Sequence, residues 1–320
     1  MSGKVQIKPG ALSVLGTGHI VPYGKKIKLM EHKYNMIKLA IASGKGGTGK
    51  TTVAVNLALA LEDKNVQYLD CDVEEPNAHL FLKPVIENSR EIGIPVPKIN
   101  FGRCNFCGRC AEVCAFNALA VFQDKVMVFE ELCHGCGSCA YLCPEKAITE
   151  VERPIGLLEE GTAGGIKFAH GRLNPGEVMS PPLIEAVKKV SRPGYINIID
   201  APPGTSCPVV SAVGGCNYCL LVTEPTPFGL NDLDLAYQMV TRLGIPSGVL
   251  INRSDLGDDG VEKYCREKGL AILQRIPWDR ELASLYARGE PVVKHLDKWR
   301  VRFRELFDKI STALKEASSH

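Results

Sequence analysis

The chain has 320 residues, a length that suits one large domain or two of ordinary size. Hydrophobic residues make up 45% of it and charged residues 23%, which is typical of a globular protein and excludes disorder, collagen and coiled coil as the main architecture. Lys and Arg number 38 against 36 Asp and Glu, so the net charge of +2 gives no global electrostatic reason to expect a nucleic-acid partner. No apolar run approaches the ~18–20 residues that a membrane-spanning helix needs.

The chain contains thirteen cysteines, an odd number. An apolar stretch near the start, residues 11–21, is broken by Gly16 and Gly18 and has no convincing signal-peptide cleavage site. Closely spaced cysteines in an intracellular chain point to bound metal rather than to disulfides, and we expect a cytoplasmic protein. Residues 1–35 carry six lysines and one glutamate, and we expect a flexible leader without chemistry of its own.

The patterned part of the chain begins after Met36. Residues 37–42 are typical of a buried strand, 43–49 form a glycine-rich loop, 50–63 have apolar residues at helical spacing, and 66–70 predict a second strand. A strand, a glycine loop and a helix in this order are the setting in which a phosphate-binding loop is found.

Residues 44–51 match the phosphate-loop pattern G-x-x-x-x-G-K-[ST]. Glycines let backbone N–H groups turn toward phosphate oxygens, and the start of the following helix adds its positive end. We expect Lys50 to reach the β- and γ-phosphates and Thr51 to ligate Mg²⁺. The residues predicted to contact ATP or ADP here are Gly44, Lys45, Gly46, Gly47, Thr48, Gly49, Lys50, Thr51 and Thr52.

Residues 99–150 contain eight of the cysteines, and the segment repeats itself after 29 positions. Each copy reads Cys-x2-Cys-x2-Cys-x3-Cys, which is the two-cluster pattern of bacterial ferredoxins. The first run is Cys104, Cys107, Cys110 and Cys114, and the second is Cys133, Cys136, Cys139 and Cys143.

In the ferredoxin pattern the fourth cysteine of each run serves the other cluster. One 4Fe–4S cluster is therefore predicted to take Cys104, Cys107, Cys110 and Cys143, and the other to take Cys133, Cys136, Cys139 and Cys114. The first run departs from the pattern in one respect, since Ala115 and not proline follows Cys114. Zinc is the alternative, but four-cysteine zinc sites use two more widely separated pairs.

Beyond residue 150 the alternation of strands and helices resumes, which predicts an α/β fold with a mostly parallel, doubly wound sheet. Residues 36–98 and 151–316 would form that domain, and 99–150 would be an inserted, small α+β domain of the ferredoxin kind. The later strands are expected at 195–200, 219–223 and 248–252, and helices around 180–190, 229–243, 260–269 and 297–316. The apolar stripe of the last helix is expected to cover a sheet face rather than to bind a membrane.

Lys45 gives the phosphate loop an additional lysine, and here the sequence resembles the deviant Walker A ATPases of the MinD/ParA group, which includes the nitrogenase iron protein. This resemblance implies a P-loop NTPase fold of the SIMIBI type, in which Lys45 acts on the nucleotide of a partner subunit. It also implies that Asp72 orients the attacking water, that Asp70 supports the Mg²⁺ site, and that Asp200 is the Walker B carboxylate.

The resemblance covers about residues 36–316 and extends to MinD-type ATPases that carry an inserted ferredoxin domain. It implies that Asn252 and Arg253 contact adenine and that residues 276–279 close over the base. It also gives the remaining cysteines possible roles. Cys207 stands where the nitrogenase iron protein binds a cluster shared across its dimer, and Cys216 with Cys219 resembles the cysteine pair of scaffold ATPases.

These features together predict a dimerising, Mg²⁺-dependent ATPase with two 4Fe–4S clusters that couples ATP to electron transfer. The dimer would be formed with a second copy or a paralogue across the nucleotide face, and the client would be a redox protein or metalloprotein. Assembly or insertion of a metal cluster is the alternative function. A ferredoxin-type electron carrier with a vestigial nucleotide site is a second alternative.

Overall fold

β1 (Ile37–Ala42) is the strand that its apolar run predicts, and its last four residues are buried because a parallel sheet is covered on both faces. The structure of the protein is a computed structural model, and it describes residues 36–317. The predicted leader at 1–35 and residues 318–320 lie outside the described part.

The chain continues through elements that alternate between helix and strand on either side of residues 100–147. Before that segment lie α2 (Lys50–Ala60), β2 (Val66–Asp70), α3 (Ala78–Leu82) and β3 (Val85–Ile99). Within it lie α4 (Arg109–Glu112), β4 (Leu119–Phe122), β5 (Lys125–Val128), the 3₁₀ turn η2 (Glu130–Leu132) and α5 (Ser138–Tyr141). After it come β6 (Ile148–Ala163), β7 (Ile166–Leu173), α6 (Ser180–Lys189), β8 (Ile196–Asp200), α7 (Cys207–Val213), β9 (Tyr218–Thr223), α8 (Pro227–Arg242), β10 (Ser247–Asn252), α9 (Gly260–Glu267), β11 (Ile272–Ile276), α10 (Arg280–Ala287), η3 (Val292–Lys294) and α11 (Asp297–Ala317).

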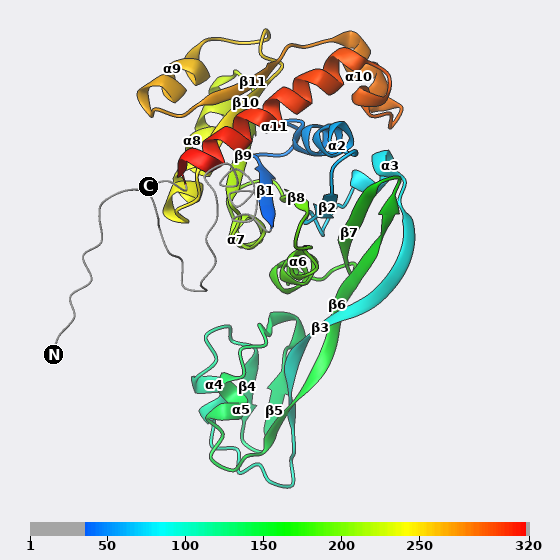
Figure 1. The fold of residues 1–320 in the computed structure, drawn as a ribbon. Coiled ribbons are helices and arrows are strands. Elements are labelled where there is room, and N and C mark those ends of the chain that lie inside the picture. Colours follow the sequence, from blue (N-terminus) through cyan, green and yellow to red (C-terminus); the bar gives the residue numbers. More distant parts are fainter. Residues whose placement is uncertain (1–35, 318–320) are drawn as a thin grey trace, which may run out of the picture. The chain divides into compact units, whose positions relative to one another are not determined.

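Nine strands form one sheet in the order β11-β10-β9-β1-β8-β2-β7-β6-β3 (Figure 1). Every neighbouring pair from β11 to β7 is parallel, whereas β6 pairs antiparallel with both β7 and β3. The predicted α/β fold with a mostly parallel sheet is therefore confirmed. β1 is flanked by β8 and β9, so the loop after β1 opens where the strand order reverses, the usual ligand position in such sheets.

Helices cover both faces of the sheet, as doubly wound folds require. One buried cluster contains residues of α2, α10 and α11, and the other contains residues of α6, α7, α8 and α9. The apolar stripe of α11, which includes Trp299, Phe303 and Ile310, is buried in the first of these clusters. The stripe therefore covers a sheet face, as expected, and α11 lies beside α2 (Figure 1).

A long antiparallel hairpin, β3 with β6, was not among the predicted strands. Residues 85–91 of β3 are all exposed and largely polar, so they lack the apolar pattern of a buried strand. Pro95 and Pro97 also argue against a strand, but β3 is the last strand of the sheet, where a missing N–H is tolerated. The register runs from Val85 opposite Thr162 to Ile99 opposite Ile148, so residues 100–147 connect two paired strand ends.

Candidate functional site

The phosphate loop joins β1 to α2 and takes a shape that favours glycine at two positions. Gly47 and Gly49 have φ angles of 80° and 92°, in the left-handed region. A Cβ on Gly49 would also lie 2.5 Å from Nδ2 of Asn252, and that amide donates a hydrogen bond of 2.8 Å to the carbonyl of Thr48. Asn252, expected to contact adenine, thus also holds the loop that surrounds the phosphates.

A cavity of about 360 Å³ opens over this loop. It brings together most of the predicted nucleotide residues, and the predicted base segment 276–279 closes one side of it. The lining includes Lys45, Gly46, Gly47, Thr48, Gly49, Lys50, Thr51, Thr52, Asp72, Asn252 and Arg253. Gly44 is absent from the lining because it packs against the backbone of α8, where a Cβ would lie 2.1 Å from the carbonyl oxygen of Asp232.

The cavity has further lining residues that the sequence analysis did not single out. They include Glu75 and Asn77 after β2, and the aromatic side chains Tyr286, Trp299 and Phe303 from the C-terminal helices. Aromatic residues at helical spacing in α11 predict core packing, and nothing in their pattern distinguishes a residue that also lines a cavity.

Lys50 lines the cavity, whereas Asp200 is buried and does not line it. The Nζ of Lys50 lies 3.8 Å from Oδ1 of Asp200, and the carboxylate is completely buried. Tyr68 donates a 2.8 Å hydrogen bond to Oδ2 of Asp200, whereas Oδ1 has no hydrogen-bond partner. A buried carboxylate oxygen without a donor beside the phosphate loop has the chemistry expected of an acceptor for a hydrated Mg²⁺.

Asp70 and Asp72 lie on the same segment but in different surroundings. Asp70 is buried, and its two oxygens accept hydrogen bonds from the backbone N–H of Asp72 (3.2 Å) and of Ala78 (3.1 Å). Burial raises the pKa of Asp70, and neighbouring Asp200 raises it further. Asp70 does not line the cavity. Its hydrogen bond from Ala78 fixes the start of α3.

Asp72 faces the cavity, as the resemblance implies for the residue that orients water. Burial raises the pKa of Asp72 to about 6, and the positive charge of Lys50 opposes that rise. A carboxylate that titrates near neutral pH can accept or return a proton during a reaction at this position.

Lys45 pairs with Glu224, the residue that follows β9. Its Nζ lies 3.9 Å from Oε2 of Glu224, and Arg253 contacts the other oxygen of the same carboxylate at 2.6 Å. Arg253 has a φ angle of 50°, which is uncommon for a residue with a side chain. Glu224 was not predicted as a site residue, since a glutamate after a strand carries no signal in the sequence.

The eight cysteines of residues 104–143 line two separate cavities. Cys104, Cys107, Cys110 and Cys143 line one, and Cys114, Cys133, Cys136 and Cys139 line the other. The two sets are those that the ferredoxin pattern predicts, with the fourth cysteine of each run in the other set. A small apolar cluster that includes Leu119, Val126 and Ile148 packs beside them.

Backbone N–H groups point at the sulfurs of both sets. Ala147 and Ala118 donate to Cys143 and Cys114, each at 3.3 Å, and these bonds are related by the internal repeat. Among residues 36–317, no group of three or more His, Cys, Asp or Glu side chains could hold a single metal ion.

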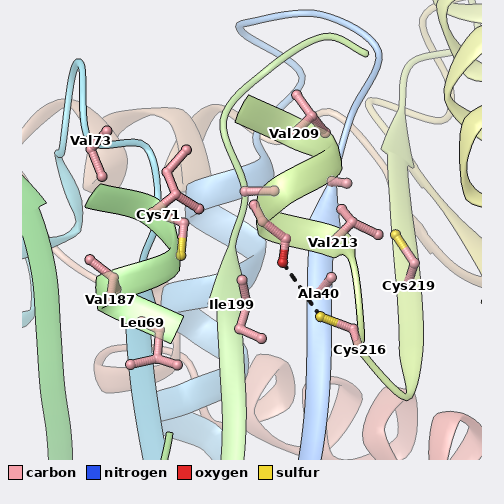
Figure 2. Packing of buried hydrophobic residues seen from close by; sticks show 14 of the residues in the cluster. Ala40, Leu69, Cys71, Val73, Val187, Ile199, Val209, Val213, Cys216 and Cys219 are labelled. Atoms are coloured by element: carbon pink, nitrogen blue, oxygen red, sulfur yellow. Dashed lines mark hydrogen bonds between the residues drawn. The ribbon is translucent and has the colours of Figure 1, made fainter. Parts of the chain in front are cut away.

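The cysteines outside these two sets differ in their exposure to solvent. Cys207 is exposed at the first residue of α7, whereas Cys216 and Cys219 are buried. Figure 2 shows both buried thiols within the apolar packing around α7, where Cys216 donates to the carbonyl oxygen of Ala212 at 3.6 Å. Burial raises the pKa of Cys216 to about 12, so this pair consists of neutral core thiols.

Cys71 and Cys265 are buried too, and both pack in a hydrophobic cluster. Every cysteine in the described residues is free. Within residues 36–317, no helix combines the length and the apolar character needed to cross a bilayer.

Comparison with known proteins matches residues 39–292 to the CobQ/CobB/MinD/ParA nucleotide binding domain. An uncharacterized protein of Methanocaldococcus jannaschii is 33% identical in an alignment 273 residues long, which covers 82% of this chain and 93% of the relative. An iron-sulfur cluster carrier protein of Pyrococcus abyssi is 27% identical in an alignment 329 residues long including gaps, which covers 97% of each chain.

Solved structures give the same fold. The septum site-determining protein MinD of Pyrococcus horikoshii, solved with Mg-ADP, has a TM-score of 0.55 and 20% identity, over 86% of this chain and 96% of that one. The cell division ATPase MinD of Pyrococcus furiosus has a TM-score of 0.53 and 21% identity, over 86% and 99%. The chain therefore belongs to the CobQ/CobB/MinD/ParA nucleotide-binding family of P-loop ATPases, and it has the fold of the MinD structures.

Proposed function

We propose that this protein is an ATP-gated, dimeric iron–sulfur protein that couples Mg²⁺-dependent ATP hydrolysis to electron transfer through two 4Fe–4S clusters. The observation that carries the proposal is that two sets of four cysteines each line one cavity in a chain whose P-loop site is complete. The clusters would store and pass single electrons, and their ligands would be the two cysteine sets named above.

At the nucleotide, each residue has a role that its position supports. The glycine loop and Lys50 bind the phosphates, and Thr51 with the free oxygen of Asp200 holds Mg²⁺ or its waters. Asp72 faces the phosphate end of the cavity and orients the attacking water. Asn252 and the segment 276–279 hold the base, and Trp278 of that segment lines the cavity.

A continuous ladder of paired strands supports coupling between the two halves of this function. Asp70 stands at the end of β2, opposite His170 on β7. His170 in turn contacts Glu159 of β6 through its Nε2 at 2.8 Å, and β6 begins at Ile148, where the cysteine-rich segment ends. A shift of the 70–78 segment when γ-phosphate binds would therefore be transmitted along the strands that lead to the cysteine-rich segment.

A second function has its own support. Iron-sulfur cluster carrier proteins of three Pyrococcus species match 97% of this chain at 26–28% identity. Assembly or delivery of a cluster to a metalloprotein is therefore the alternative to electron transfer. In that case an ATP-dependent dimer would hold a transferable cluster, for which exposed Cys207 is the available thiol.

One experiment separates the two functions. Protein reconstituted anaerobically with iron and sulfide is reduced, freed of reductant, and mixed with an oxidised viologen, which takes one electron from each reduced cluster. Electron transfer predicts that ATP and ADP give different rates while the iron stays bound. The carrier function predicts instead that ATP moves iron and sulfide into an added apo-ferredoxin, and equal viologen rates would overturn ATP-gated electron transfer.

A further inference from the structure

Glu224 is shared between two cations that belong to opposite ends of the nucleotide site. One of its oxygens lies 3.9 Å from Nζ of Lys45 in the phosphate loop, and the other lies 2.6 Å from Arg253 in the base segment. The glutamate side chain is only 12% exposed, against 34% for Lys45 and 48% for Arg253. The carboxylate is therefore the fixed member of the group, and the two cations are the members that can move.

The backbone explains why Glu224 is fixed. It directly follows β9, and its carbonyl oxygen accepts the N–H of Thr226 at 2.8 Å, which closes a tight corner before α8. A Cβ on Gly229 would lie 2.2 Å from that same carbonyl, so only glycine lets α8 pack this closely. The corner leaves the carboxylate little freedom to follow Lys45 if the lysine moves.

The two loop lysines point in different directions. Lys50 faces the buried Asp200 inside its own cavity, where it is positioned for the phosphates. Lys45 is drawn toward Glu224, and as long as it stays there its charge is neutralised within its own chain. A lysine held in this way is unavailable to a second subunit.

We propose that Glu224 is a positioning residue that retains Lys45 within its own subunit and thereby sets the ATP concentration and protein concentration at which two copies pair. The inference rests on the proposed ATP-driven dimer, in which Lys45 reaches the partner's nucleotide. Pairing then exchanges the Glu224 carboxylate for phosphate oxygens as the counterion of Lys45.

Arg253 makes this exchange reversible. When Lys45 leaves, Glu224 still has the guanidinium at 2.6 Å, so no buried carboxylate is left without a cation. The contact of Lys45 with Glu224 is long and partly solvated, and ion pairs of this kind change an equilibrium by only about two- to five-fold. Glu224 therefore restrains pairing modestly and does not block it.

The test measures self-association by analytical ultracentrifugation with Mg-ATP, in an Asp72→Asn background so that ATP is not consumed. Glu224→Gln keeps the shape of the side chain and removes its charge, and it is expected to tighten association about two- to five-fold. Arg253→Gln is the matched variant, for which the opposite change in association is expected. It leaves Lys45 as the only cation on Glu224, so association is expected to weaken at Mg-ATP concentrations that saturate each variant.

The affinity of single chains for ADP, measured at protein concentrations too low for pairing, is the control readout. Retention of Lys45 predicts that Glu224→Gln changes association while ADP affinity stays the same, whereas a purely structural role predicts lower ADP affinity and a lower Tm. Equal or weaker association of Glu224→Gln, or tighter association of Arg253→Gln, would overturn the inference. Wild-type protein that never associates with ATP would instead overturn the proposed dimer, and the inference with it.

Discussion

The Nζ of Lys50 lies 3.8 Å from Oδ1 of Asp200, with the lysine side chain 8% exposed and the aspartate fully buried. The carboxylate oxygen that faces the lysine has no hydrogen-bond donor. The ammonium group of Lys50 is therefore the charge that compensates a buried carboxylate before any nucleotide arrives.

This relationship predicts that Lys50 matters for stability as well as for binding. Lys50→Ala is expected to abolish ATP turnover and to lower the free energy of unfolding by about 3–5 kcal/mol, because it leaves a buried charge without a partner. Lys50→Ala combined with Asp200→Asn should recover most of that stability and none of the activity. Chemical denaturation without nucleotide measures the first effect, and a double variant no more stable than the single one would contradict it.

The raised pKa of Asp72, about 6, predicts a pH dependence of stability. An unfolded chain ionises this carboxyl near its ordinary pKa of 3.8, so the folded protein holds the proton more tightly between about pH 4 and 6. The stabilising effect is fully present below pH 4 and is lost as the pH rises through 6. Without nucleotide, Asp72→Asn should therefore be more stable than wild type at pH 7.5, and the difference should vanish below pH 4.

The control for this measurement is the comparison of the two proteins at pH 3.5, where neither side chain at position 72 carries a charge. Asp72→Asn should also hydrolyse ATP slowly while still binding it, and wild-type turnover should fall as the pH drops through 6. A stability difference that persists at pH 3.5 would show that the variant acts through packing and not through charge.

A lysine that acts across a dimer predicts complementation between two inactive variants. Lys45→Ala and Asp72→Asn should each hydrolyse ATP slowly, because each homodimer lacks one of the two groups at both sites. In a mixture, one composite site of the mixed dimer has Lys45 from one chain and Asp72 from the other. ATPase activity should then return, and a mixture no more active than its components would place Lys45 in its own subunit's site.

The two cysteine-lined cavities predict how many irons each chain binds, and they predict that losing a ligand from one cavity halves that number. Anaerobically prepared protein should hold about eight irons per chain, and Cys136→Ser should retain about four. Cys107→Ser should lose the other cluster, whereas Cys265→Ser, in a buried thiol of α9, should keep all eight irons. Iron and sulfide analysis with EPR of the reduced protein measures this, and stoichiometric zinc in place of iron would refute the assignment.

The hydroxyl of Ser138 predicts that the two clusters differ in reduction potential. Its Oγ accepts a hydrogen bond of 3.4 Å from the thiol of Cys136, and this contact lowers the pKa of that thiol. Toward an iron-bound thiolate, which has no proton, the hydroxyl would be the donor. In the first repeat the corresponding residue is Arg109, which pairs with Glu112 instead. Donors to ligand sulfur stabilise the reduced cluster, so Ser138→Ala should lower the potential of one cluster.

Arg109→Ala removes the corresponding side chain of the first repeat and is the matched control for Ser138→Ala. It should leave the potential of the Cys136 cluster unchanged in EPR-monitored titrations. If both variants shift both clusters equally, the effect is one of overall charge and not of the Ser138 hydroxyl.

Much of the candidate site could be predicted from short-range patterns in the sequence. The phosphate loop, the strand before it and the cysteine runs depend on neighbouring residues, and their spacing alone limits what they can bind. The helix of residues 297–316 was predictable for a similar reason, because its apolar stripe has to be covered. The α/β fold with a parallel sheet followed from the alternation of such local elements.

Other features depend on which distant segments meet. The exposed, polar half of β3 is a strand only because β6 pairs with it, and no local pattern marks that partner. Cys216 and Cys219 resemble a ligand pair in sequence, yet packing against α7 buries them as neutral thiols. Glu224 meets Lys45 and Arg253 because β9 lies between β1 and β10 in the sheet, which places the three strand ends side by side. Strand order is set by long-range packing, and so are the contacts that depend on it.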